Sequence, residues 1–191
     1  MGSLEYRVMS VSIRVAKATD SHELVPLAAR TFPLACPPEM ASAAVQEFIR
    51  EELNEKVFRN WISDDNAYVL VATDGAMLVG YSVCIHGEIP ENAKLDRELP
   101  VESTVMLSKF YVDPDFHGAG VSQKMMRHLL EHYLTSDQQW IWLGTNQAND
   151  RAIGFYERVG FQQIGTRTFD IGGTMAKDVV LARPLPSVED A

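Results

Sequence analysis

Cysteine is scarce in this sequence, and so are the usual signs of a secreted or membrane protein. The two cysteines, Cys36 and Cys84, lie far apart, with no CxxC spacing and no nearby histidine cluster. Neither a disulfide framework nor a metal site is therefore expected, and a reducing cytoplasm fits best. The sequence also has no apolar run long enough to span a membrane and no signal segment at its start.

Basic residues are outnumbered, since 17 Lys and Arg stand against 26 Asp and Glu, giving a formal net charge of −9. General nucleic-acid binding relies on basic patches, so this balance argues against it, whereas it suits a cationic small molecule. A length of 191 residues, 46% of them hydrophobic, predicts one globular domain. We expect this domain over residues 11–185, with 1–10 as a disordered tail or vector-derived remnant and 186–191 as a C-terminal tail.

Hydrophobic periodicity predicts the elements of the first half of the chain. They are a strand at 12–16, helices at 22–32 and about 40–61, a hairpin of strands 67–72 and 77–83, and a strand at about 104–112. The helix at 40–61 rests on apolar positions at helical spacing, from Val45 to Val57. Residues 86–102 have two prolines, many charges and no apolar period, which predicts a long surface loop.

The second half alternates helix and strand. We expect a helix after Gly120, a buried strand at 140–143, a short helix ending at Gly160, and two last strands at about 161–169 and 177–182. This alternation predicts a single-domain α/β sandwich, in which helices flank a mixed central sheet.

A glycine turn between the strand at 104–112 and the next helix is the most informative segment. Gly118 and Gly120 permit backbone angles that other residues avoid and let a ligand approach the main chain. The amides that follow open a helix, where they have no partner within the helix and sit at the positive end of its dipole. The turn therefore suits a phosphate, and Lys124 and Arg127 would add positive charge. Taken alone, it is also compatible with an ordinary surface turn.

Two blocks of this sequence resemble the GNAT superfamily of N-acetyltransferases over about residues 11–183. One is His117-Gly118-Ala119-Gly120-Val121-Ser122, similar to the acetyl-CoA motif Q/R-x-x-G-x-G/A, with His117 in the place of Arg or Gln. The other is the stretch from Asn149 to Phe161, similar to N-x-x-A-x-x-F-Y-x-x-x-G-F. The resemblance implies a mostly antiparallel sheet whose fourth and fifth strands splay apart.

The same resemblance implies acetyl-CoA as co-substrate, and its binding residues carry over by position. They are Phe110, Tyr111, Val112, His117, Gly118, Ala119, Gly120, Val121, Ser122, Gln123, Asn149, Phe155 and Tyr156. Of these, Tyr156 would lie near the thioester sulfur. A phenol with a pKa of about 10 can protonate a departing thiolate without first being ionised. The alternative is that Tyr156 is only a core residue with a satisfied hydroxyl.

The base that deprotonates the acceptor amine is not assigned by the sequence. Many superfamily members place a glutamate on the fourth strand at the position of Ser108, and this chain does not. His86, Glu88, Glu102 and a water chain are the candidates, and each of the three side chains could equally be a solvated loop residue.

The C-terminal part, about 166–185, is similar to the ending of PaiA-type polyamine acetyltransferases. We therefore expect transfer of an acetyl group to a small amine or polyamine, without a metal, nucleic acid or membrane and with a homodimer left open. Asp178 is either a structural partner in the last strand or an acceptor for a cationic substrate. The alternatives are a protein or aminoglycoside acetyltransferase, or a catalytically silent acyl-CoA-binding module.

Overall fold

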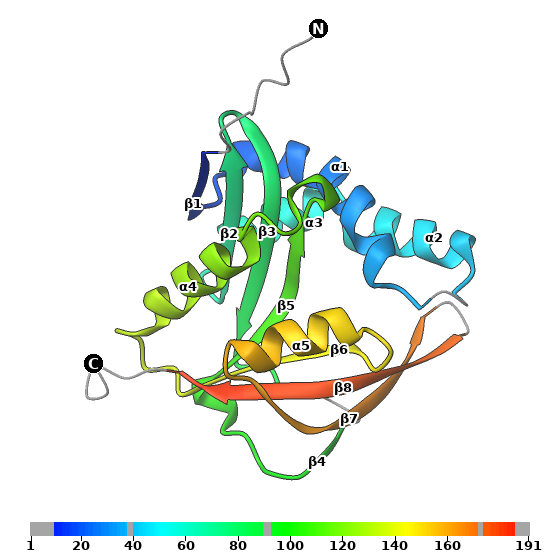
Figure 1. The fold of residues 1–191 in the computed structure, drawn as a ribbon, viewed down its shortest axis with the longest axis vertical. Coiled ribbons are helices and arrows are strands. Elements are labelled where there is room, and N and C mark those ends of the chain that lie inside the picture. Colours follow the sequence, from blue (N-terminus) through cyan, green and yellow to red (C-terminus); the bar gives the residue numbers. More distant parts are fainter. Residues whose placement is uncertain (1–9, 38–39, 90–92, 172–173, 186–191) are drawn as a thin grey trace, which may run out of the picture.

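The computed structural model describes residues 10–37, 40–89, 93–171 and 174–185. The tails predicted at 1–10 and 186–191 lie outside them except for residue 10. The described residues form one eight-stranded sheet in the order β1-β2-β3-β5-β6-β8-β7-β4 (Figure 1). The strands are β1 Val11–Val15, β2 Ala67–Asp74, β3 Met77–His86, β4 Ala93–Leu95, β5 Thr104–Val112, β6 Trp140–Asn146, β7 Gln162–Ile171 and β8 Thr174–Pro184. The α-helices are α1 Ser21–Thr31, α2 Ser42–Glu52, α3 Glu55–Ser63, α4 Val121–Tyr133 and α5 Asp150–Arg158.

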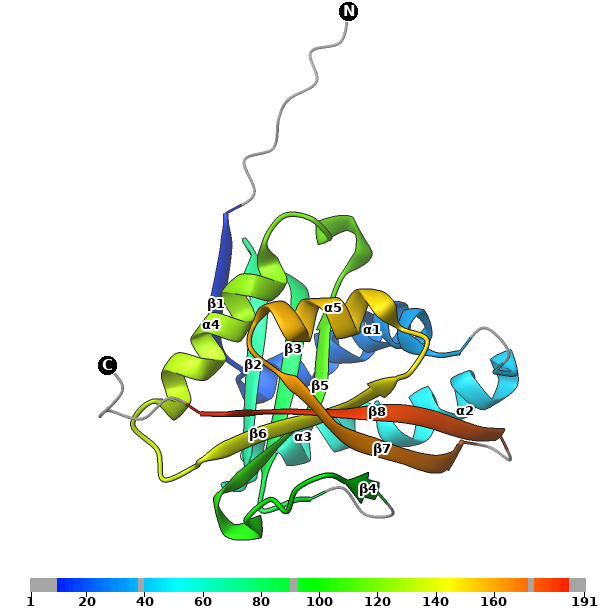
Figure 2. The same ribbon diagram turned by 60° about the horizontal axis from the view of Figure 1, so that its bottom comes forward.

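The sheet is mixed and mostly antiparallel, because β5 and β6 form its one parallel pair among the described strands. These two strands pair only from Thr104 opposite Trp140 to Met106 opposite Trp142. Beyond that point β5 continues along β3 and β6 continues along β8, so the sheet opens between them (Figure 2). The predicted α/β fold with two splayed strands is confirmed.

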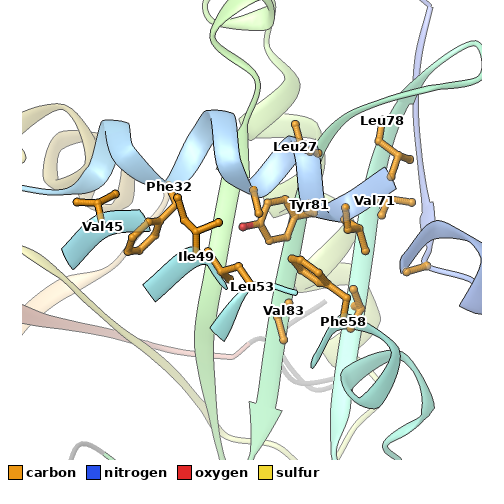
Figure 3. Packing of buried hydrophobic residues seen from close by; sticks show 14 of the residues in the cluster. Leu27, Phe32, Val45, Ile49, Leu53, Phe58, Val71, Leu78, Tyr81 and Val83 are labelled. Carbon is orange, nitrogen blue, oxygen red and sulfur yellow. The ribbon is translucent and has the colours of Figure 1, made fainter. Parts of the chain in front are cut away.

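Helices cover both faces of the sheet. In Figure 1, α4 and α5 lie in front of it and α1 and α3 lie behind it. Figure 3 shows the core on the α1–α3 side, where Tyr81 of β3 is fully buried beside Leu27 and Phe58. On the other side, Met126 and Leu129 of α4 are buried with residues of β5, β6 and α5. The two hydrophobic layers hold β5 between them.

The prediction of a single helix at 40–61 is wrong, because the chain forms two helices there. Asn54 separates them: its Oδ1 accepts a hydrogen bond from the Val57 amide at 3.1 Å and caps α3. Its Nδ2 donates to the carbonyls of Arg50 and Glu51 at the end of α2. One side chain thus ends one helix and begins the next, although the apolar spacing continues across it.

The loop predicted at 86–102 is also more structured than expected. It contains the short strand β4, which pairs with β7, and a 3-10 turn at Val101–Ser103. Leu99 is buried against Trp142 and Ile164, and the Trp142 indole donates to the Glu88 carbonyl at 2.7 Å. Backbone pairing and a few scattered apolar contacts anchor this segment, and neither produces a long hydrophobic period in the sequence.

Candidate active site

A cavity of about 410 Å³ lies where β5 and β6 separate. Its walls come from the end of α1 and the turn that follows, from β5 and β6, from the glycine turn and from α5. Every residue predicted to contact acetyl-CoA lines this cavity except Ala119. The lining members are Phe110, Tyr111, Val112, His117, Gly118, Gly120, Val121, Ser122, Gln123, Asn149, Phe155 and Tyr156.

The glycine turn has the backbone geometry that its sequence suggests. Gly118 and Gly120 adopt left-handed conformations, with φ of 81° and 76°. Helix α4 begins at Val121, and its first internal bond runs from the Lys124 amide to the Gly120 carbonyl. The amides of Val121, Ser122 and Gln123 therefore have no carbonyl one turn earlier to bond. All three residues line the cavity, so an anion there would meet the positive end of the helix dipole.

The positive side-chain charge on the cavity wall comes from residues that sequence reasoning missed. Arg151 and Arg158 of α5 line the cavity, whereas Lys124 and Arg127 do not. Arg127 instead lies 3.9 Å from Glu131 on the solvent side of α4. The clue in the sequence is helical spacing, because Arg151 and Arg158 are seven residues apart and so share one face of a helix.

His117 lines the cavity and is held by the end of β5. Its Nε2 lies 2.9 Å from the Val112 carbonyl, and a ring N–H donated there ties the glycine turn to the end of β5. This bond leaves Nδ1 as the ring atom that could meet a phosphate. The donors that fit a coenzyme A diphosphate are therefore the α4 amides and the two arginines of α5.

Tyr156 lies on α5 at the inner wall of the cavity and is 8% exposed. Its ring packs against Phe155 at 5.3 Å, Phe161 at 5.5 Å and Phe110 at 6.2 Å between ring centroids. Burial, with smaller contributions from Tyr111 and Cys84, raises the pKa of the Tyr156 hydroxyl above its usual value. The phenol is thus neutral at physiological pH and can donate a proton or hydrogen bond.

Strand β5 carries an irregularity beside Tyr156. Val83 of β3 pairs with Lys109 while its neighbour Cys84 pairs with Leu107, so Ser108 is an extra residue without a partner in β3. Such a bulge twists the strand and redirects the groups around it. Ser108 lines the cavity together with Leu107 and Phe110. The irregularity therefore turns polar groups of β5 toward the space between the splayed strands.

Comparison with known proteins identifies the family to which this chain belongs. Residues 28–161 match the model of the acetyltransferase (GNAT) family. An uncharacterized N-acetyltransferase of Mycobacterium bovis is 37% identical over 167 residues, which cover 87% of this chain and 99% of the relative. The chain belongs to the GNAT family. It is an acetyl-CoA-dependent N-acetyltransferase, as the two sequence blocks predicted.

Solved structures agree on the GNAT fold. The PaiA N-acetyltransferase of Thermoplasma acidophilum, whose crystal structure contains coenzyme A, superposes with a TM-score of 0.72. The match covers 92% of this chain and 99% of that one at 17% identity. A further relative, the spermine/spermidine N(1)-acetyltransferase of Bacillus subtilis, is 29% identical over 103 residues, or 53% of this chain and 64% of the relative.

None of the three side chains considered as base in this GNAT enzyme lines the cavity. The Nε2 of His86 lies 3.0 Å from the Tyr133 hydroxyl at the far end of α4, and burial lowers the pKa of His86. Glu88 is exposed and uses its carbonyl to hold Trp142. Glu102 is exposed on the 3-10 turn before β5.

The sequence left two roles open for Asp178, and the structure shows the structural one. The Nε and Nη2 atoms of Arg167 donate to its Oδ2 at 3.1 and 2.9 Å, and the residue is 5% exposed. Among the residues that the structure describes, no group of three or more His, Cys, Asp or Glu is placed to hold a metal ion. The described helices are too short or too polar to cross a membrane.

Proposed function

We propose that this GNAT enzyme acetylates the amine of a small molecule, with polyamines as the first class to test. The observation that carries the proposal is that one cavity joins the glycine turn, which suits a phosphate, to Tyr156, which suits a leaving thiolate. An acetyl-CoA bound along it would place its thioester where β5 and β6 separate.

Each part of the co-substrate then has a partner. The α4 amides, Arg151 and Arg158 would hold the phosphates, because helix N-termini and guanidinium groups are both favourable to anions. The main chain of Phe110, Tyr111 and Val112 would bond the pantetheine arm, with Asn149 opposite. The Asn149 Oδ1 already accepts from the Ala152 amide at 3.1 Å, which fixes the side chain at the start of α5.

Tyr156 would act as the general acid. The amine attacks the thioester carbon, the C–N bond forms, the C–S bond breaks and the sulfur takes the phenolic proton. Burial disfavours the charged phenolate, so the phenol is neutral at physiological pH and can hydrogen-bond the departing sulfur. A main-chain amide near the bulge at Ser108 would stabilise the oxyanion of the tetrahedral intermediate.

Two observations support a small cationic amine as acceptor. The C-terminal part is similar to that of polyamine acetyltransferases, and the Bacillus subtilis relative acts on spermine and spermidine by its name. Asp178 adds nothing to this case, because Arg167 already neutralises it. A cytoplasmic location and a homodimer stay predictions.

A protein N-terminus or lysine is the second candidate. The N-alpha-acetyltransferase RimI of Mycobacterium tuberculosis is 32% identical over 109 residues, or 57% of this chain and 60% of that relative. A peptide acceptor would have to reach the same thioester as a small amine, so amine and peptide substrates have to be compared directly.

The test is thiol release from acetyl-CoA with spermidine, an arylalkylamine, an aminoglycoside, an alanine-terminated peptide and a lysine peptide as acceptors. Tyr156→Phe should lower kcat at least tenfold for the best acceptor while the affinity for acetyl-CoA changes little. Tyr68→Phe, on β2 and outside the cavity lining, is the matched control and should keep the wild-type rate. If acetyl-CoA binds but no acceptor releases thiol, the protein is instead a catalytically silent acyl-CoA-binding module.

A further inference from the structure

Lys109 is a half-buried lysine close to the cavity. It follows Ser108 on β5 and pairs with Val83, whose side chain belongs to the core on the α1–α3 side. Its neighbour Phe110 instead stacks on Phe155 of α5, at 5.8 Å between ring centroids. Because successive side chains of a strand point to opposite faces, Lys109 lies on the face away from α5 and Tyr156.

The Lys109 ammonium group has two close neighbours. Its Nζ lies 5.4 Å from the centre of the Trp61 ring on α3, and 3.0 Å from the Ser108 hydroxyl. Ser108 lines the cavity that contains Tyr156, whereas Lys109 does not. The Lys109 Nζ also donates to the Ser108 carbonyl at 3.4 Å, but only the Ser108 hydroxyl can pass a proton between Lys109 and the cavity. It can donate one hydrogen bond while it accepts another.

The surroundings of Lys109 bring the loss of its proton closer to neutral pH. Burial is the main cause that lowers the pKa of the Lys109 ammonium, to about 8. Glu52 at the end of α2 and Glu88 after β3 oppose this shift, while Arg167 of β7 adds to it. Arg167 is itself paired with Asp178. A lysine with these neighbours can lose and regain a proton near neutral pH, which an exposed lysine cannot.

The reaction needs a proton acceptor on this side of the cavity. An alkylamine has a pKa of about 10.4, so near pH 7 only about one molecule in a thousand is a free nucleophile. No Asp or Glu lines the cavity among the described residues, and the Nε2 of its histidine, His117, is held by the Val112 carbonyl. Tyr156 lies on the opposite wall and is assigned to the leaving group.

We propose that Ser108 and Lys109 form a proton relay that deprotonates the acceptor amine. Ser108 would touch the amine, and Lys109 would act through it from the other face of the sheet. The inference rests on the proposed function and supplies the base that the sequence left unassigned.

The relay accounts for every proton of the reaction. The acceptor ammonium group passes one proton to the Ser108 oxygen, while the Ser108 hydroxyl proton moves to neutral Lys109. The free amine nitrogen then attacks the thioester carbon, the C–N bond forms, the C–S bond breaks, and the thiolate takes the proton of Tyr156. The second proton of the nitrogen passes through water to the Tyr156 phenolate, and Lys109 returns its proton to water after product release. An acid and a base thus act from opposite faces of the opened sheet.

The kinetic test compares Lys109→Met, Lys109→Arg and Ser108→Ala with the wild type, using the best amine found above. At about pH 7.5, Lys109→Met and Ser108→Ala should each lower kcat by about 10²-fold, within the range of general base catalysis. Lys109→Arg should be as slow as Lys109→Met, because a guanidinium keeps the charge but cannot accept a proton. Lys56→Met, an exposed lysine on α3, is the matched control and should keep the wild-type rate.

The pH profile separates a relay from a structural role. Wild-type kcat should rise with pH and level off above about 8, as the cited pKa of Lys109 requires. In Lys109→Met the rate should keep rising toward about pH 10, because hydroxide and the free amine replace the missing base. Titration by NMR with carbon-13-labelled lysine should show a resonance, absent from Lys109→Met, with a midpoint near 8.

Several results would overturn the relay alone. They are wild-type activity in Lys109→Arg, an unchanged pH profile in Lys109→Met, or a Lys109 resonance that titrates above about pH 10. Affinity for acetyl-CoA should stay within about twofold in all variants, so a large loss of binding would also count against it. If the wild type acetylates no amine, the proposed function fails and the relay fails with it.

Discussion

Arg167 and Asp178 face each other across β7 and β8 as direct register partners, and two hydrogen bonds join the guanidinium to one carboxylate oxygen. The Arg167 side chain is 20% exposed and that of Asp178 is 6% exposed. The guanidinium also packs on Gly144 of β6, where an added Cβ would collide with it, and lies 5.5 Å from the centre of the Trp142 ring. The pair therefore ties three neighbouring strands together beyond the point where the sheet opens.

Asp178→Ala should lower the free energy of unfolding by roughly 3 kcal/mol, because it leaves a largely buried guanidinium without its carboxylate. Urea denaturation measures the change, and exposed Asp65→Ala should be within about 0.5 kcal/mol of the wild type. If Asp178 instead bound the acceptor, the variant would keep its stability and show a raised KM for polyamines.

Two glycine variants, one of them in the glycine turn, separate backbone strain from an effect on acetyl-CoA binding. Gly120 and Gly75 both have positive φ, of 76° and 63°, and an added Cβ would meet nothing closer than 3.9 Å at Gly120 and nothing within 4 Å at Gly75. Alanine at either position should therefore cost about 1–2 kcal/mol of stability from backbone strain.

Only Gly120→Ala should also weaken acetyl-CoA binding, by about tenfold or more, since only Gly120 precedes the amides that line the cavity. Calorimetry on both variants, beside their thermal unfolding, makes the comparison. Equal affinities would mean that the turn does not contact the co-substrate.

The fold could be predicted from the sequence because its strongest signals are periodic or depend on backbone angles. The C-terminal end of α5 shows this: Gly160 has φ of 92°, and the Phe161 amide bonds the Tyr156 carbonyl at 3.0 Å, as the Gly-Phe pair indicated. The break at Asn54 and the strand β4 were missed, because each depends on a few specific hydrogen bonds rather than on a repeated pattern.

The residues of the candidate site could also be predicted only in part. The motif residues of both blocks meet at one cavity, with the exception of Ala119, because they sit at fixed places on the strand, turn and helix. Lys109 could not be recognised in advance, since an isolated lysine in a strand has no sequence signature. Its environment includes Trp61 and Arg167, which come near it only in the folded chain.

The double role of Asn54 leads to a stability prediction. Asn54→Ala removes the cap of α3 and the two bonds that close α2, so we expect a loss of about 1–2 kcal/mol. Asn54→Asp keeps the accepting oxygen and should recover the part due to the α3 cap. Chemical denaturation of the two variants distinguishes the contributions, and an Asn54→Ala protein as stable as the wild type would contradict the assignment.

The rings of Tyr68, His86, His132 and Tyr133 pack together at the C-terminal end of α4, and the two histidines make the stability of the protein depend on pH. Burial lowers the pKa values of His86 and His132, with His86 adding to the shift of His132. The folded protein therefore binds fewer protons than the unfolded chain as the pH falls below about 6.5, and stability is lost on acidification through that range. His86→Gln can keep a hydrogen bond to Tyr133 but has no proton to gain. Its melting temperature should thus fall less than that of the wild type between about pH 7.5 and 5.5. His128→Gln, exposed on α4, should follow the wild-type curve, and a His86→Gln curve parallel to both would place the acid sensitivity elsewhere in the molecule.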